Sequence, residues 1–79
     1  MKEVKFSKEE KELIRVAEEC GFEQWGYRSW RKNGEVGKES LTKSVVNKGE
    51  WSLVREYLNG TRMKITAMDI DDIVYWVIT

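Results

Sequence analysis

Apolar positions between residues 8 and 20 recur at the spacing of an α-helix. The stripe consists of Leu13, Val16, Ala17 and Cys20. Ser7 and Glu10 form the pattern Ser-x-x-Glu, a capping box that satisfies free amide groups at a helix N-terminus. Gly21 follows at the position where helices commonly end in a left-handed residue. We therefore predict a helix over Lys8 to Cys20, with Cys20 in the core.

Two segments in the middle of the chain, 40–47 and 50–58, have weaker helical patterns. Their apolar positions are, in order, Leu41, Val45, Val46, Leu53, Val54, Tyr57 and Leu58. Helical spacing fits these positions better than alternation does, so we expect helices in both segments. Asn59-Gly60 then forms either a helix C-cap or a hairpin turn. The glycines at 34 and 37 predict a loop over residues 34–38.

The last part of the chain changes its pattern twice. Arg62 to Ala67 alternates between polar and apolar residues, which predicts a strand. Asp69 is a suitable N-cap for a final helix. The apolar stripe of that helix would be Ile70, Ile73, Val74 and Val77. Residues 73–79 are also dense in β-branched and aromatic side chains, so a buried strand is the alternative.

Residues 23–34 fit two different structures. In a strand, Trp25 and Tyr27 would share one face and Asn33-Gly34 would form a hairpin turn. In a helix over 23–32, Asn33-Gly34 would be the C-cap, and the acidic start and basic end would suit the helix dipole. Both interpretations remain open.

These patterns together predict an α+β fold. We expect one small domain over residues 1–79, helix-rich with a minor antiparallel sheet. The alternative is an all-α fold of the helix-turn-helix type. A chain of 79 residues has room for a single core.

Charge is balanced over the whole chain but not along it. The sequence has 14 basic and 14 acidic side chains, which argues against a generic polyanion binder. Residues 1–20 carry a net charge of −1, residues 21–64 carry +4 and residues 65–79 carry −3. Folding could turn this pattern into a dipolar surface.

Few residues suit catalysis. The chain has no histidine, the commonest general base and metal ligand, and its one cysteine has no partner for a disulfide or a zinc site. Asp69, Asp71 and Asp72 are more typical of a capped helix start than of a cation site. We expect no enzyme activity, no cofactor and no bound metal. A free thiol and no apolar leader or span favour a cytoplasmic protein without a membrane partner.

One short stretch combines aromatic and basic residues, the mixture typical of interface hot spots and of single-strand binders. We predict that it binds the partner through Trp25, Tyr27, Arg28, Trp30, Arg31 and Lys32. Within Gly21 to Val36, the frame Gly-Phe, Arg-Ser-Trp and Gly-Glu-Val resembles excisionase-like and MerR-like helix-turn-helix domains. That resemblance implies a DNA-contacting helix, but residues 23–26 depart from its usual start, so it assigns no family.

The leading functional hypothesis is a small non-enzymatic module, a regulator or inhibitor, that binds a protein partner. The alternative is a nucleic-acid-binding regulator of the helix-turn-helix type. An origin in a phage or mobile element is a further hypothesis, supported by no particular residue.

Overall fold

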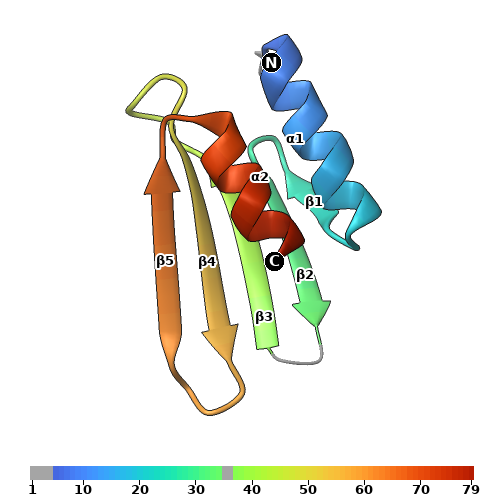
Figure 1. The fold of residues 1–79 in the computed structure, drawn as a ribbon, viewed down its shortest axis with the longest axis vertical. Helices are drawn as coiled ribbons and strands as arrows, with labels where there is room; N and C mark the ends of the chain where they lie inside the picture. The colour runs from blue at the N-terminus through green and yellow to red at the C-terminus, as the bar shows by residue number, and fades with distance from the viewer. Residues whose placement is uncertain (1–4, 35–36) are drawn as a thin grey trace.

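The computed structural model describes residues 5–34 and 37–79, which form two helices and five strands (Figure 1). Their order is α1 (Lys8–Glu19), β1 (Glu23–Gly26), β2 (Ser29–Gly34), β3 (Gly37–Lys43), β4 (Trp51–Tyr57), β5 (Arg62–Ala67) and α2 (Ile70–Ile78). One helix therefore precedes all the strands, and the other follows them.

Local signals determine where both helices begin. The Glu10 amide donates to Ser7 Oγ, and the Ser7 amide donates to the Glu10 carboxylate, so the predicted capping box is present. At the start of α2, the Asp71 amide donates to Asp69 Oδ1. The predicted first helix is confirmed, with Cys20 as its C-cap and partly buried against the core. The last segment is a helix, so its strand alternative is wrong.

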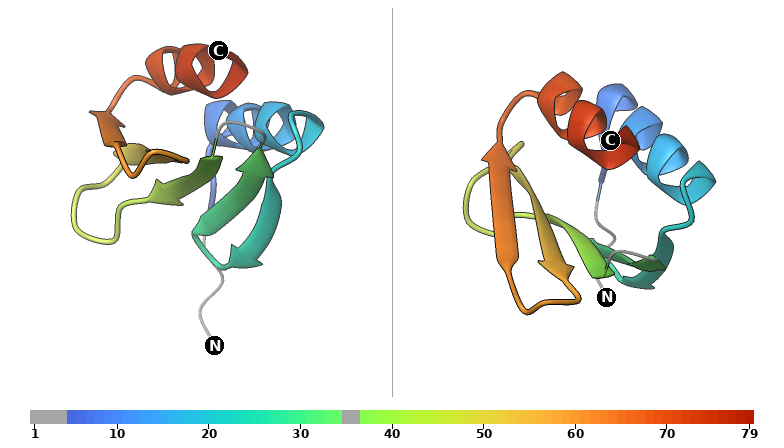
Figure 2. Two further views of the ribbon diagram at one scale, coloured as in Figure 1. Left: turned by 90° about the horizontal axis from the view of Figure 1, so that it is seen from below. Right: turned by 60° about the horizontal axis from the view of Figure 1, so that its bottom comes forward.

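The five strands form one antiparallel sheet in chain order, β1-β2-β3-β4-β5. Its register aligns the apolar side chains: Leu41 pairs with Trp30 on one side and with Leu53 on the other. Residues paired directly across strands point to the same face, so this row lies on a single side of the sheet. Both helices cover that side (Figure 2).

The core lies between the helices and the covered face of the sheet. It consists of Leu13, Ala17, Phe22, Trp30, Leu41, Trp51, Leu53, Ile73 and Val77. The Trp30 and Trp51 rings lie 5.8 Å apart, and Phe6 packs against both. Neither helix reaches the opposite face of the sheet (Figure 2), which we call the open face.

The prediction of a helix-rich fold is wrong, and so is the all-α alternative, because the described chain has more strand than helix. The segment 40–47 belongs to β3 and the loop after it, and the segment 50–58 forms β4. Positions i and i+4 share one face of a strand as well as of a helix, so Leu53 and Tyr57 fit both structures. The strand predicted over Arg62 to Ala67 is confirmed.

Residues 23–34 form a hairpin, so the helix interpretation of this stretch is wrong. The turn lies at Tyr27-Arg28 and not at Asn33-Gly34, because Asn33 and Gly34 pair with Lys38 and Gly37 inside the sheet. The loop predicted over 34–38 is therefore mostly strand, and its residues 35 and 36 lie outside the described residues.

The turn between β4 and β5 is the last segment for which the sequence allowed two structures. Asn59-Gly60 connects them as a hairpin turn: the Tyr57 amide donates to the Thr61 carbonyl, and Gly60 has a φ of 89°. The resemblance to helix-turn-helix domains fails, because residues 23–26, which would begin the recognition helix, form strand β1.

Candidate functional site

Trp30, one of the six residues predicted to bind a partner, lies in the core. Its side chain is 1% exposed and packs between Phe6 and Trp51. A small chain needs its largest side chains to fill the interior. Trp30 therefore belongs to the core and offers no surface to a partner.

Arg28 and Lys32 are held by the body of the fold. Lys32 Nζ lies 3.9 Å from a Glu39 carboxylate oxygen and 5.8 Å from the centre of the Phe22 ring. The Arg28 carbonyl accepts a hydrogen bond from the Lys43 amide. Arg28 Nε is buried and has no acceptor among the described residues. Both side chains are only partly exposed. The Lys32 side chain and the Arg28 backbone thus attach the hairpin to the rest of the sheet.

Trp25, Tyr27 and Arg31 are the predicted residues that reach the surface. Trp25 and Tyr27 are each 60% exposed, the first on β1 and the second in the following turn. The Arg31 guanidinium lies 5.3 Å from the centre of the Trp25 ring, within cation–π range. Because β1 is an edge strand, this pair forms one border of the open face.

Three rows of side chains cross the open face, each formed by residues paired in register. The hydroxyl row is Ser29, Thr42, Ser52 and Thr66; the middle row is Arg31, Ser40, Val54 and Lys64; the charged row is Asn33, Lys38, Glu56 and Arg62. Ser52 Oγ and Thr66 Oγ1 lie 3.3 Å apart, as expected for neighbours on one face. The rows therefore present hydroxyl, amide and cationic groups around one apolar side chain, Val54.

The open face carries four cationic side chains and two carboxylates. The cations are Arg31, Lys38, Arg62 and Lys64, and Glu23 pairs across from Arg31 at the β1 edge. Glu56 accepts a 2.8 Å hydrogen bond from Arg62, which, with the charge of Lys38, lowers the pKa of that carboxyl. In the part of the chain that the structure describes, Lys38 and Lys64 form no ion pair. Positive charge on this face is therefore only partly neutralised.

A shallow pocket of about 340 Å³ lies on this face beside Trp25. The other residues that line it come from β2 and β3: Arg31, Lys32, Asn33, Lys38, Glu39 and Ser40. One aromatic residue, three basic residues and a hydroxyl group thus border one depression, with Glu39 as its acidic member.

The helical layer has the opposite charge. Exposed carboxylates on the helices outnumber exposed cations: Glu9, Glu12, Glu18, Glu19, Asp69, Asp71 and Asp72 against Lys8, Lys11 and Arg15. Arg15 forms ion pairs with Glu12 and Glu19. Both helices lie on the same side of the sheet (Figure 2). The uneven charge along the chain therefore becomes a difference between two faces. A neutral net charge therefore conceals a basic face and an acidic face.

The sequence analysis did not predict the three rows of the open face. Arg62, Lys64 and Thr66 are the polar positions of the one strand that alternation predicted. Their cross-strand partners lie on β4, and the next members of each row lie on β3; the spacing predicted helices in both segments. Alternation gave no signal along β3, because Glu39 and Lys43 are charged and Leu41 is the one apolar residue of 38–43.

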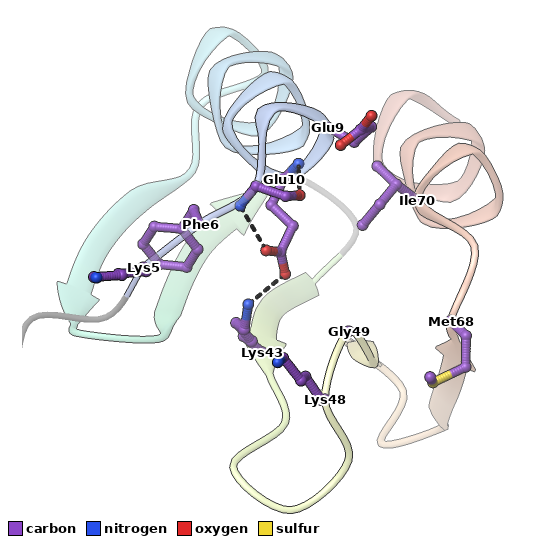
Figure 3. Close-up of a pocket in the computed structure, with 10 residues that line it drawn as sticks. Lys5, Phe6, Glu9, Glu10, Lys43, Lys48, Gly49, Met68 and Ile70 are labelled. Atoms are coloured by element: carbon purple, nitrogen blue, oxygen red, sulfur yellow. Dashed lines mark hydrogen bonds and ion pairs between the residues drawn. The ribbon is translucent and has the colours of Figure 1, made fainter.

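A second pocket, of about 600 Å³, opens between the starts of the two helices (Figure 3). Phe6, Met68 and Ile70 form part of its wall, and Glu10 points across it toward Lys43 (Figure 3). Glu10 accepts hydrogen bonds from Lys43 Nζ at 2.6 Å and from Trp51 Nε1 at 2.7 Å. The charged groups at its base are thus already used by the fold.

The pKa of Glu10 is lowered. Burial opposes ionisation of this carboxyl, but the bonds from Lys43, the Ser7 amide and Trp51 outweigh it. The ionised Glu10 is therefore a structural acceptor that ties α1 to the sheet.

Searches of family models, of curated proteins and of solved structures find no match to this chain. Across 5–34 and 37–79, no cluster of His, Cys, Asp and Glu is arranged to hold a metal ion. Within the same ranges, neither helix has the length and apolarity needed to cross a bilayer.

Proposed function

We propose that the chain is a binding module, and that its open face binds the phosphate backbone of a nucleic acid. The observation that carries this proposal is the composition of the three rows: cations and hydroxyl donors predominate, and Val54 is the one apolar member. Phosphate oxygens accept hydrogen bonds from side chains of these types.

A protein partner suits these rows less well. The centre of a protein–protein interface is depleted in charge and enriched in aromatic and other apolar residues. Among the residues that the structure describes on the open face, such residues occur at Val54 and at the Trp25 border. The cations, by contrast, extend across the sheet: Arg31 lies on β2, Lys38 on the central strand β3 and Lys64 on the edge strand β5.

The opposite charge of the helical layer supports the same orientation. The exposed carboxylates of α1 and α2 would repel a polyanion, whereas the open face would attract it. The molecule would therefore approach nucleic acid with its sheet and keep its helices in solvent.

Binding of fluorescently labelled oligonucleotides over a series of salt concentrations tests this proposal. Affinity should fall steeply with salt, because bound cations displace counterions from the phosphates. The double variant Lys38→Glu/Lys64→Glu should weaken binding by about tenfold or more and reduce the salt slope. The matched control Lys8→Glu/Lys11→Glu makes the same change in net charge on α1 and should bind as the parent does.

Two results would overturn the proposal: equal losses in both double variants, or no binding to any oligonucleotide at low salt. Circular dichroism of each variant shows whether the fold is retained. An effect of net charge alone would make the two variants equivalent, so their difference isolates the open face.

The second candidate is a regulatory or inhibitory module that binds a protein. The observation in its favour is that Trp25 and Tyr27 are exposed on and beside an edge strand, and edge strands can pair with an added strand of a partner. A photo-crosslinking residue at position 27 should then capture one partner from host extract. That capture should be lost with Trp25→Ala and kept with Tyr75→Ala on α2.

A further inference from the structure

We infer that the nucleic acid is single-stranded and that one of its bases stacks on Trp25. This inference rests on the proposed function, because it needs a backbone bound on the open face. It adds a stacking platform and excludes an intact duplex as the preferred ligand.

Trp25 is more exposed than the other three tryptophans. Trp30 and Trp51 are fully buried and Trp76 is partly buried, whereas Trp25 is 60% exposed. Burying a tryptophan would help a chain of this size, so an exposed indole on a short edge strand contributes little to the core. A π-face in solvent is what single-strand binders use to stack bases.

Arg31 lies both beside the Trp25 ring and on the open face. Its guanidinium lies 5.3 Å from the centre of the Trp25 ring and restrains the orientation of the indole. Register also places Arg31 in the middle row of the open face, beside Ser40. The same residue therefore links the aromatic platform to the phosphate-binding rows.

Strand β1 is irregular at Trp25. A β-bulge interrupts the pairing of β1 and β2 between Gln24 and Gly26, on either side of Trp25. Bulges redirect a side chain and bend the strand. Here the bulge accompanies an indole that borders the pocket of about 340 Å³ formed with Arg31 and Lys38.

A single strand can use this arrangement, and a duplex cannot. Bases in a duplex are stacked on one another and present only their edges in the grooves. A base from a single strand can leave its neighbours and stack on an aromatic ring while its phosphates contact adjacent cations. The pocket places Trp25 next to Arg31 and Lys38, which is the adjacency such binding requires.

Four ligands separate the contributions of bases and phosphates. The first is oligothymidine of about 12 nucleotides, within the usual range of site sizes. The others are an abasic chain of the same length, a duplex of the same length, and oligouridine, which distinguishes RNA from DNA by its 2′-hydroxyls. Oligothymidine or oligouridine should bind roughly 5- to 150-fold more tightly than the abasic chain, the range expected for stacking of one base.

Three variants locate the effect. Trp25→Leu should remove the preference over the abasic chain, and Trp25→Phe should retain most of it, because phenylalanine keeps a π-face. Tyr75→Leu removes an equally exposed aromatic residue from α2 and should change nothing. Thermal unfolding of each variant confirms that differences in binding do not come from loss of the fold.

The outcomes distinguish this inference from the proposed function. Salt-dependent binding that is equal for oligothymidine and the abasic chain, or tighter for the duplex, would overturn the stacking inference and leave the open-face proposal intact. Absence of binding to all four ligands would overturn both. A preference for bases that survives Trp25→Leu would place the stacking residue elsewhere and also refute the inference.

Discussion

Lys43 Nζ on β3 lies 2.6 Å from Glu10 Oε2 on the first turn of α1. The same carboxylate oxygen accepts a hydrogen bond from Trp51 Nε1 on β4. One buried acid thus joins the first helix to two strands more than 30 residues away in sequence.

Glu10→Ala should lower the free energy of unfolding by about 3–5 kcal/mol. The substitution leaves the Lys43 ammonium and the Trp51 indole N–H without their acceptor in a mostly buried site. Urea denaturation measures the change. Glu9→Ala alters the exposed neighbour in the same helical turn and should have a small effect; equal losses in the two variants would show that the buried network contributes little.

Stability should depend on pH through Glu10. Its pKa is lowered from 4.5 in the folded chain, so its contribution is fully present above about pH 4.5 and is lost as pH falls through the folded pKa. Glu10→Gln should be less stable at neutral pH and should lose less stability on acidification. Unfolding midpoints from neutral pH to about pH 3 measure this. Glu12 and Glu56 also have lowered pKa values and titrate in both proteins, so parallel curves would exclude Glu10 as the cause.

The features that could be predicted from the sequence are those with local causes. The capping box at Ser7, the N-cap at Asp69 and the alternation in Arg62 to Ala67 each depend on residues close together in the chain. The aromatic and basic stretch was also visible, and Trp25 and Arg31 do meet at the surface. Which of its members face solvent was not visible, because burial of Trp30 depends on Phe6 and Trp51.

Strands β3 and β4 were missed because charged side chains occupy inward positions. Arg55 lies on the covered face between Leu53 and Tyr57, which breaks the apolar alternation expected of a half-buried strand. Its Nε donates to Glu39 at 3.0 Å and its Nη2 donates to the Trp76 carbonyl at 3.1 Å. These partners come from β3 and α2, so no local pattern could have predicted that a charge is accommodated there.

Trp30→Ala should reduce the stability of the fold much more than Trp25→Ala. Loss of Trp30 leaves a cavity beside Phe6 and Trp51 and should cost about 3–5 kcal/mol. Loss of Trp25 removes an exposed ring and should change the unfolding midpoint little. Thermal unfolding of the two variants measures this. A larger loss for Trp25→Ala than for Trp30→Ala would contradict the placement of both side chains.

Gly37→Ala should disrupt the end of the sheet where β3 meets β4. Gly37 has a φ of +149°, a conformation that residues with a side chain rarely adopt. A Cβ at this position would collide with the backbone carbonyl oxygen of Glu56 and lie 2.9 Å from Tyr57 Cα. Because backbone cannot move aside as a flexible side chain can, the two strands would have to separate, and we expect a loss of about 4 kcal/mol or more.

Gly26→Ala is the matched control for this substitution. A Cβ at Gly26 would meet Ser29 Cβ at 3.7 Å, an ordinary contact, so the variant should stay folded. Urea denaturation compares the two variants. Amide hydrogen exchange should then be faster in Gly37→Ala at the paired residues Lys38 and Glu56, and unchanged there in Gly26→Ala. If both glycine variants were equally stable, β3 and β4 could not approach as closely at this end as their register requires.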